Sequence, residues 1–317
     1  MLTRQVLFMI FAFIVSFAFT FATTPLVRRF AFKIGAIDIP KDNRRMHKKP
    51  TPRIGGLAII FGFTVATLCF AQPSRQLYGT LAGAAIIAVM GVIDDCKNLP
   101  AKLKFVIQII AALVVVFAGD IKIDVFTNPN FLSDNPYWVL PEWLSVTLTV
   151  IWIVFITNAV NFIDGLDGLA AGVSAIMSIS LVFISIRVGE YSIAILGIAL
   201  MGSCFGFLPF NFNPAKIFMG DTGSLFLGAS VALMAIDLKM PIHLILIGFV
   251  YFMETLSVIM QTAYFKYTKK KYGEGRRIFK MSPIHHHFEM CGWKEKKIVA
   301  VFTLVTVITC AVAYFAI

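Results

Sequence analysis

The sequence predicts an all-α protein that crosses a membrane about ten times. Of its 317 residues, 58% are hydrophobic, and the mean hydropathy is +0.83. The apolar residues fall into ten runs of about 16–25 residues, and a helix of that length can cross a hydrocarbon core of about 30 Å. Runs this long and this numerous are not expected in a water-soluble protein. We therefore expect residues 1–317 to form a single transmembrane domain.

The ten predicted helices follow one another through short connections. The basic pair Arg28-Arg29 follows the first apolar run. This order favours a first helix that stays in the membrane over a cleaved signal peptide, whose charges precede the apolar core. In chain order the predicted spans are 5–27, 54–73, 78–94, 104–119, 143–160, 168–187, 191–209, 224–238, 241–265 and 298–316.

The cationic residues predict the orientation of these helices. Nearly all 28 Lys and Arg residues lie in or beside the connections that follow the odd-numbered spans. The positive-inside rule places these connections in the cytoplasm and both termini outside. The net charge of +11 therefore indicates a basic membrane face that attracts anionic lipids and substrates, with no nucleic-acid partner expected. The exceptions are Arg4, Arg75, Lys122, Arg187 and Lys239.

Acidic residues gather on the same predicted face. Asp94 and Asp95 end the third span, where a carboxylate is costly to bury and its presence indicates a function. Farther along, Asn211 and Phe218 precede Asp221, which lies in a Gly-rich turn at the foot of the eighth span. These connections therefore combine acids, amides and an aromatic side chain at one membrane surface.

The connection after the fifth span carries two more acids. Asp164 and Asp167 are three residues apart, so one helical turn would place them on the same face. Asn158 and Asn161 precede them and offer amide groups for hydrogen bonding. Glycines among these residues allow the backbone to approach a ligand closely.

Five carboxylates on one face suit a hard, oxygen-preferring cation. Mg²⁺ binds one or two carboxylates together with water and substrate phosphates. Neighbouring Lys and Arg side chains would neutralise phosphate charge, so the pattern indicates phosphoryl transfer. The alternative is that each Asp only caps a helix at the membrane edge, which does not readily account for all five. A secondary transporter is disfavoured because its polar groups would lie near the midplane.

Two further polar features need an explanation. His285, His286 and His287 are consecutive, so their side chains point in different directions, which is unusual for a zinc site. We expect them to contact phosphate, sugar or nucleotide instead. Glu254 lies inside the ninth span, and its role is open between a structural pair and a functional one.

With these motifs in view, the chain resembles the polyprenyl-phosphate N-acetylhexosamine-1-phosphate transferase family. Four separated motifs occur in the same order and on the same membrane face: 94–95, 158–168, 211–224 and 285–287. The resemblance implies ten spans in the bacterial cytoplasmic membrane, a cytoplasmic active site and Mg²⁺. It also implies attack by undecaprenyl phosphate on a UDP-linked N-acetylhexosamine, with release of UMP. A homodimer is left open.

The resemblance assigns roles residue by residue. Asp221 corresponds to the Mg²⁺ ligand. Asp94, with Asp95 beside it, corresponds to the acid that deprotonates or orients the acceptor phosphate. Asp164 and Asp167 correspond to catalytic positions in the loop around the pyrophosphate and nucleotide. The implied substrate-binding residues are Lys48 in the basic first loop, Asn158, Asn161, Asn211, Phe218, which would stack on uracil, His285, His286 and His287.

Two branches of the family differ in the donor sugar. Residues 38–56 resemble the branch that uses UDP-N-acetylglucosamine and starts wall teichoic acid and other surface polysaccharides. Residues 277–293 resemble the phospho-N-acetylmuramoyl-pentapeptide transferase of peptidoglycan synthesis. More of the chain resembles the first branch, so the sequence favours N-acetylglucosamine, with the muramoyl pentapeptide as the alternative.

Overall fold

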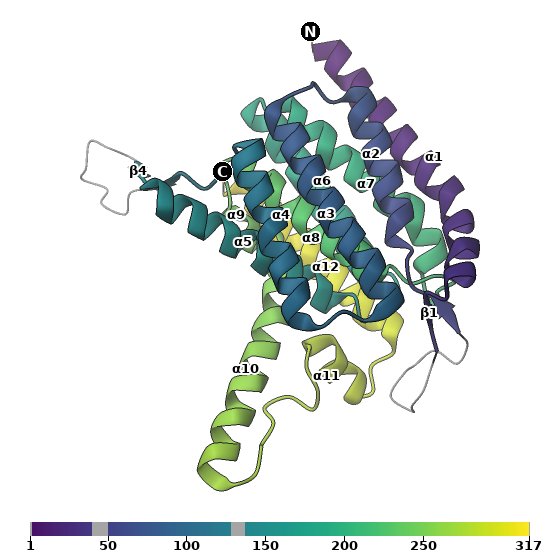
Figure 1. Cartoon of the computed structure of the whole chain (residues 1–317), viewed down its shortest axis with the longest axis vertical. Helices are drawn as coiled ribbons and strands as arrows, with labels where there is room; N and C mark the ends of the chain where they lie inside the picture. The colour runs from purple at the N-terminus through teal and green to yellow at the C-terminus, as the bar shows by residue number, and fades with distance from the viewer. Residues whose placement is uncertain (1, 40–49, 128–136, 317) are drawn as a thin grey trace.

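The computed structural model describes residues 2–39, 50–127 and 137–316, and its described part is a bundle of long helices (Figure 1). The predicted all-α class is confirmed. The helices are α1 (Leu2–Ile34), α2 (Gly56–Phe70), α3 (Arg75–Lys97), α4 (Ala101–Gly119), α5 (Glu142–Ile163), α6 (Leu169–Val188), α7 (Tyr191–Asn211), α8 (Gly220–Asp237), α9 (His243–Ile247), α10 (Phe249–Tyr272), α11 (Ile284–Met290) and α12 (Glu295–Phe315).

Short strands occur only in connections within the described residues. Strands β1 (Ile37–Asp38) and β2 (Thr51–Pro52) pair antiparallel after α1. Strands β3 (Val125–Thr127) and β4 (Tyr137–Val139) pair antiparallel between α4 and α5. The second pair belongs to the 120–142 connection.

Each predicted span overlaps at least one helix, and the chain is a multi-pass membrane protein. Seven helices are long and apolar enough to cross a membrane by length and composition: α1, α3, α4, α5, α6, α7 and α12. Helix α2 is apolar but has only 15 residues. The count of ten crossings and the orientation therefore remain predictions.

The ninth predicted span differs most from the structure. The run 241–265 is interrupted at Gly248, which separates the five-residue α9 from α10. Helix α10 then continues past residue 265, because lysines at 269–271 favour helix and interact well with its carboxyl end. It ends at Gly273, whose φ of 77° is readily adopted by a residue without a side chain.

Helix α8 lies in the middle of the bundle and is almost entirely buried. Its neighbours approach it closely at glycines. A Cβ atom added at Gly91 of α3 would lie 2.4 Å from Cα of Thr222, and one added at Gly56 of α2 would lie 2.1 Å from Cα of Gly223. Small residues allow such backbone contacts between helices in membranes. These contacts fix the beginning of α8 against α2 and α3.

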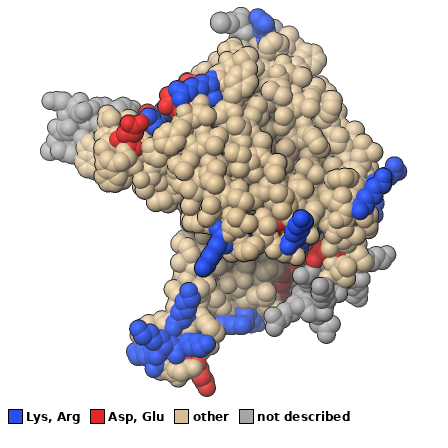
Figure 2. All heavy atoms as spheres, in the orientation of Figure 1, with Lys and Arg blue, Asp and Glu red and all other residues tan. Residues whose placement is uncertain are grey.

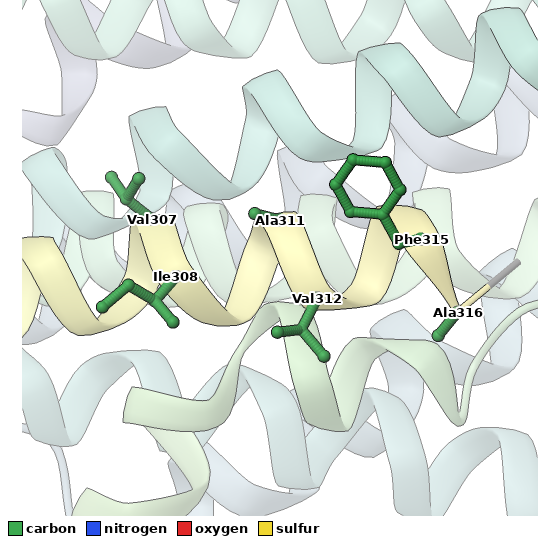
Figure 3. Close-up of a pocket in the computed structure, with 6 residues that line it drawn as sticks. All are labelled: Val307, Ile308, Ala311, Val312, Phe315 and Ala316. Atoms are coloured by element: carbon green, nitrogen blue, oxygen red, sulfur yellow. The ribbon is translucent and has the colours of Figure 1, made fainter.

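The outer surface is mainly apolar, as expected of helices that face lipid. Figure 2 shows a broad surface with few charged side chains and a basic cluster over the free end of α10. A groove along the end of α12 is lined only by apolar residues (Figure 3). In Figure 1 both chain ends lie in the upper part of the view, while α11 and the free end of α10 lie below. The groove residues are Val307, Ile308, Ala311, Val312, Phe315 and Ala316.

Candidate active site

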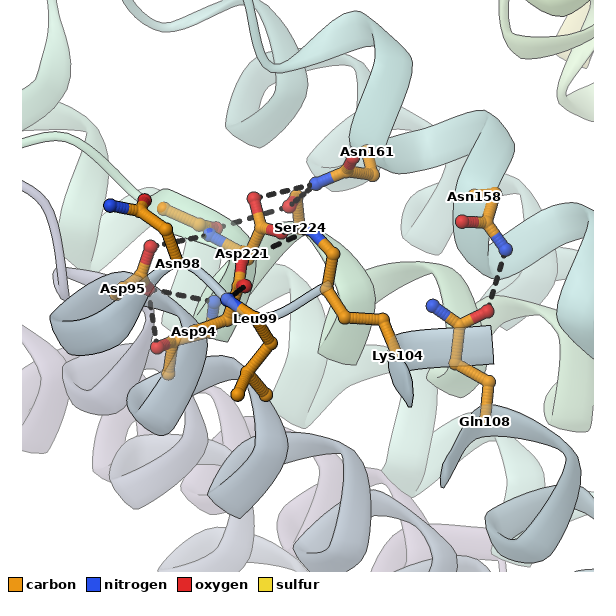
Figure 4. A network of polar contacts seen from close by, with 12 residues as sticks. Asp94, Asp95, Asn98, Leu99, Lys104, Gln108, Asn158, Asn161, Asp221 and Ser224 are labelled. Atoms are coloured by element: carbon orange, nitrogen blue, oxygen red, sulfur yellow. Dashed lines mark hydrogen bonds and ion pairs between the residues drawn. The ribbon is translucent and has the colours of Figure 1, made fainter. Parts of the chain in front are cut away.

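A polar network lies where α3, α4, α5 and α8 begin or end, and Figure 4 shows its side chains. Asp94 is in the last turn of α3, Lys104 is in the first turn of α4, and Asp221 is the second residue of α8. Acids predicted from separate parts of the sequence thus meet in one place.

Lys104 links two of these acids. Its ammonium nitrogen Nζ lies 3.1 Å from Oδ2 of Asp94 and 3.0 Å from Oδ2 of Asp221. The other oxygen of Asp94 accepts a 2.6 Å hydrogen bond from the backbone N–H of Leu99. The Asn161 amide donates to Oδ1 of Asp221 at 3.0 Å and to Ser224 at 2.9 Å. Asp94, Asp221 and Asn161 were proposed from the sequence, whereas Lys104 was only counted among the basic residues.

The Asp95 carboxylate binds the backbone at the beginning of α8. It accepts hydrogen bonds from the backbone N–H groups of Asp221 (3.1 Å) and Thr222 (3.0 Å), and from the Thr222 hydroxyl (2.6 Å). The first N–H groups of a helix have no partner within the helix, so this carboxylate satisfies them. Only 3% of the Asp95 side chain is exposed. The geometry therefore gives Asp95 a positioning role for Asp221.

Gly220 makes this arrangement possible. It has a φ of 72°, and an added Cβ would lie 1.8 Å from the Arg53 carbonyl oxygen and 2.5 Å from Oδ2 of Asp95. Arg53 itself donates to the carbonyl oxygens of Asp95 (3.0 Å) and Asp94 (3.3 Å), at the carboxyl end of α3. A cation at this end of a helix is favourable.

Asp164 and Asp167 lie in the non-helical turn between α5 and α6, so the expected helical face is wrong. Asp167 accepts from the Ala215 N–H at 2.8 Å and from Asn213 at 3.2 Å, and so holds the α7–α8 connection. The pKa of Asp164 is raised well above its usual range by burial and by the negative charges of Asp221, Asp95 and Asp167. The charged form of Asp164 is therefore disfavoured in the free protein.

The side chains of Asn211 and Glu295 also form hydrogen bonds with these connections. The Asn211 side chain accepts from the Gly168 N–H and donates to the Ile217 carbonyl oxygen, both at 3.0 Å. Oε1 of Glu295, in the first turn of α12, accepts from the Asp167 N–H at 2.7 Å. Glu295 was not proposed from the sequence because a single acid at a helix start resembles an ordinary cap.

Three other predicted substrate-binding residues have different surroundings. Asn158 lies one turn below Asn161 on α5 and donates to Gln108 at 2.6 Å, apart from the acids in Figure 4. Phe218 is half-buried, and its N–H donates to the Pro52 carbonyl oxygen at 2.7 Å, so the connection before α8 lies against β2. Lys48 lies outside the described residues.

The three histidines have three different partners. Nδ1 of His285 lies 3.0 Å from Oε1 of Glu254, and neither side chain is exposed. His286 pairs with Glu289. Nδ1 of His287 accepts from the Lys280 N–H at 3.1 Å. Among the described residues no three His, Cys, Asp or Glu side chains are grouped to hold a metal ion.

The histidine segment also contacts the turn that carries Asp164 and Asp167. A Cβ added at Gly165 would lie 2.3 Å from Nε2 of His285 and 3.3 Å from Nε2 of His286. The structure thus brings together the second, third and fourth sequence motifs around one turn. Together with Lys104 and Arg53, they form a polar site at one end of an apolar bundle.

Comparison with known proteins supports one family. Residues 77–239 match glycosyl transferase family 4. A phospho-N-acetylmuramoyl-pentapeptide-transferase of Caldicellulosiruptor bescii is 38% identical over 313 residues, covering 96% of each chain. A protein of the same name from Clostridium botulinum is 35% identical, covering 96% of this chain and 95% of the relative. A probable undecaprenyl-phosphate N-acetylglucosaminyl 1-phosphate transferase of Bacillus subtilis is 44% identical over 237 residues, covering 74% of this chain and 64% of the relative.

Proposed function

Because the chain belongs to glycosyl transferase family 4, we propose that it transfers a phospho-N-acetylhexosamine from a UDP-linked donor to undecaprenyl phosphate, with release of UMP. The observation that carries this proposal is the pair of carboxylates, Asp94 and Asp221, held on one Lys104 ammonium. Carboxylates and a cation at the membrane edge suit a reaction between two phosphate-bearing substrates, one of them a lipid.

The same residues fit a magnesium ion. Mg²⁺ binds one or two carboxylates and completes its coordination with water and substrate phosphates. Asp221, 25% of whose side chain is exposed, would hold the ion. Bound there, the ion would stabilise negative charge on the transferring phosphoryl group.

The chain's own groups divide the remaining work. Asp94 would orient the acceptor phosphate and accept its proton where one is present. Lys104 would neutralise phosphate charge once the substrates displace it from the two acids. Asn161 and Asp95 fix Asp221 from two sides through its carboxylate and its backbone N–H. Asp164, Asp167 and the histidine segment would surround the donor.

We infer ten crossings with both termini outside the cytoplasm. Helices α2, α8 and the interrupted pair α9–α10 would supply three crossings in addition to the seven long apolar helices. This orientation places the acidic network, β1–β2 and the basic end of α10 on the cytoplasmic side, where a UDP-linked donor is available. The protein would thus be a multi-pass enzyme of the bacterial cytoplasmic membrane.

For the donor sugar, we propose the N-acetylmuramoyl-pentapeptide. The relatives that match nearly the whole chain carry that name, and residues 277–293 resemble the same branch. N-acetylglucosamine, which the sequence alone favours, is the second candidate because the Bacillus subtilis relative shares a higher identity over three quarters of the chain.

The test is a transfer assay in vesicles that contain undecaprenyl phosphate. We expect UMP release that requires both the lipid and Mg²⁺, with the higher kcat/KM for UDP-N-acetylmuramoyl-pentapeptide. A preference for UDP-N-acetylglucosamine would select the second candidate. No UMP release with either donor from folded protein would overturn the proposed reaction, and uptake of donor without lipid product would indicate a transporter.

A further inference from the structure

Helix α10 carries a stripe of polar side chains that face the protein interior. Glu254, Gln261 and Thr268 are spaced seven residues apart, which is about two helical turns, so they lie on one face. Their exposed fractions are 0%, 8% and 1%. Buried polar groups need hydrogen-bond partners, and those of this stripe lie largely in one segment of the chain.

That segment is 276–285, which runs back along α10 towards α11. The Thr268 hydroxyl oxygen accepts from the Arg276 N–H at 2.8 Å. Gln261 accepts from the N–H groups of Ile278 (2.9 Å) and Phe279 (3.0 Å), and it donates to the Phe279 carbonyl oxygen at 3.1 Å. The stripe therefore holds the backbone of this segment at successive points.

Glu254 makes the last of these contacts and the most specific one. Its Oε2 accepts from the His285 N–H at 3.5 Å, and its Oε1 lies 3.0 Å from Nδ1 of the same residue. One carboxylate thus engages both the backbone and the ring of His285. A hydrogen bond at one ring nitrogen sets the orientation of the ring and the role of the other nitrogen.

The other nitrogen, Nε2, is buried and has no hydrogen-bond partner among the described residues. It faces Gly165, where an added Cβ would lie only 2.3 Å away. Gly165 is itself exposed, in the turn that carries Asp164 and Asp167. Leaving a buried polar group unpaired is unfavourable, so an atom held in this way suits a partner that arrives with the substrate.

We propose that Glu254 is a positioning residue that fixes His285 with Nε2 directed at Gly165, ready to pair with a polar group of the bound donor. This inference rests on the proposed function for the identity of the donor. Glu254 itself does not contact the substrate. Gln261 and Thr268 support this positioning by holding the backbone that precedes His285.

The test compares three variants of the full-length protein in the vesicle assay. Glu254→Ala should lower donor kcat/KM by on the order of 100-fold, because a small displacement of a contacting group is enough for such a loss. Glu254→Gln, whose amide oxygen can still accept from Nδ1–H, should recover most of it. Ser257→Ala is the matched control, because this buried hydroxyl on the same helix donates only to the Glu254 carbonyl oxygen.

A double variant separates positioning from general damage. If Glu254 acts through His285, the effects of Glu254→Ala and His285→Ala should not add, and the double variant should equal His285→Ala alone. Additive losses, or Glu254→Ala activity within threefold of the wild type, would overturn the inference. Failure of the proposed function would appear differently, as a wild-type protein that releases no UMP.

Hydrogen exchange tests the positioning without turnover. The amides of 284–290 should exchange faster in Glu254→Ala than in the wild type, and should be unchanged in Ser257→Ala. Unchanged exchange in Glu254→Ala would also overturn the inference. If Glu254→Ala does not fold, Glu254→Gln and Gly165→Ala take its place: the first should keep activity near wild type, whereas the second should lose it because its Cβ would displace His285. The reverse order would contradict the proposal.

Discussion

Asp94 and Asp221 share a single cation, the ammonium of Lys104, although one acid ends α3 and the other begins α8. In the free protein the lysine offsets the repulsion between two nearby negative charges. When Mg²⁺ and phosphates bind, the same lysine would be available to neutralise the phosphate charge. The same ion pairs would therefore stabilise the free site and supply the cation that the bound phosphates need.

Replacing Lys104 tests this link. Lys104→Met should destabilise the metal-free protein by about 1–3 kcal/mol, because two partly buried carboxylates lose their common partner. Thermal unfolding in detergent with a chelator measures the effect, and added Mg²⁺ should restore more stability to the variant than to the wild type. Lys102→Met, at an exposed lysine on the same helix, is the control. Equal responses to Mg²⁺ in both variants would count against the shared site.

Asp221→Asn should abolish turnover while the protein still folds and inserts. Loss of a charged metal ligand removes several kcal/mol of transition-state stabilisation. The rate is measured against Mg²⁺ concentration, and Asp237→Asn at the other end of α8 is the matched control. A near-normal rate at limiting Mg²⁺ would show that Asp221 is not the ligand.

Asp94→Asn should slow the chemical step more than it weakens donor binding. Its carboxylate is 7% exposed and faces Lys104, the cation that we propose neutralises phosphate charge. The second pKa of a phosphate monoester is about 6, so Asp94 is needed less as a strong base than as an orienting group. Steady-state kinetics give kcat and the donor KM separately. An unchanged kcat with only a raised donor KM would assign the role elsewhere.

Asp164→Asn should stabilise the free protein at neutral pH. Burial and neighbouring acids raise the folded-state pKa of Asp164, so the folded protein binds its proton more tightly than the unfolded chain. The free energy of unfolding therefore falls as pH rises from the unfolded-state pKa of about 3.9 through the raised folded-state pKa. The asparagine variant lacks this loss. Between pH 4 and 8 its melting temperature should therefore rise increasingly above that of the wild type as pH rises. Parallel curves would contradict the raised pKa.

Donor choice should depend on Glu289 more than on Phe288. Phe288 stacks on Trp293 with ring centroids 4.8 Å apart, so it anchors α11 to the chain that leads into α12. Glu289 holds His286, whose Nε2 points towards Gly165. Glu289→Ala should change the kcat/KM ratio of the two UDP-sugars, whereas Phe288→Leu should mainly lower the melting temperature. If only Phe288→Leu changes the ratio, this assignment is wrong.

The sequence predicted the helices well because lipid-facing spans need long apolar runs and leave a clear hydropathy signal. It also indicated which connections meet, since it predicted the acids of three of them on one basic face. It did not predict the break at Gly248, because one glycine in an apolar run is compatible with a continuous helix.

The roles of single side chains were harder to predict. Asp94 and Asp95 are adjacent in the sequence, yet one faces Lys104 and the other holds the backbone of α8. Their roles differ only because the two side chains leave the last turn of α3 in different directions. Lys104 and Glu295 carry no local pattern, because each is defined by a partner on a distant helix.

The backbone contact between Gly91 and Thr222 has a further consequence. Membrane helices tilt when the thickness of the bilayer changes, and lipid-facing helices respond first. Helices α3 and α8 touch main chain to main chain one turn from Asp94 and beside Asp221, so their separation there does not depend on lipid or on flexible side chains. The distance between the two acids should therefore stay nearly constant when the protein moves between thin and thick membranes.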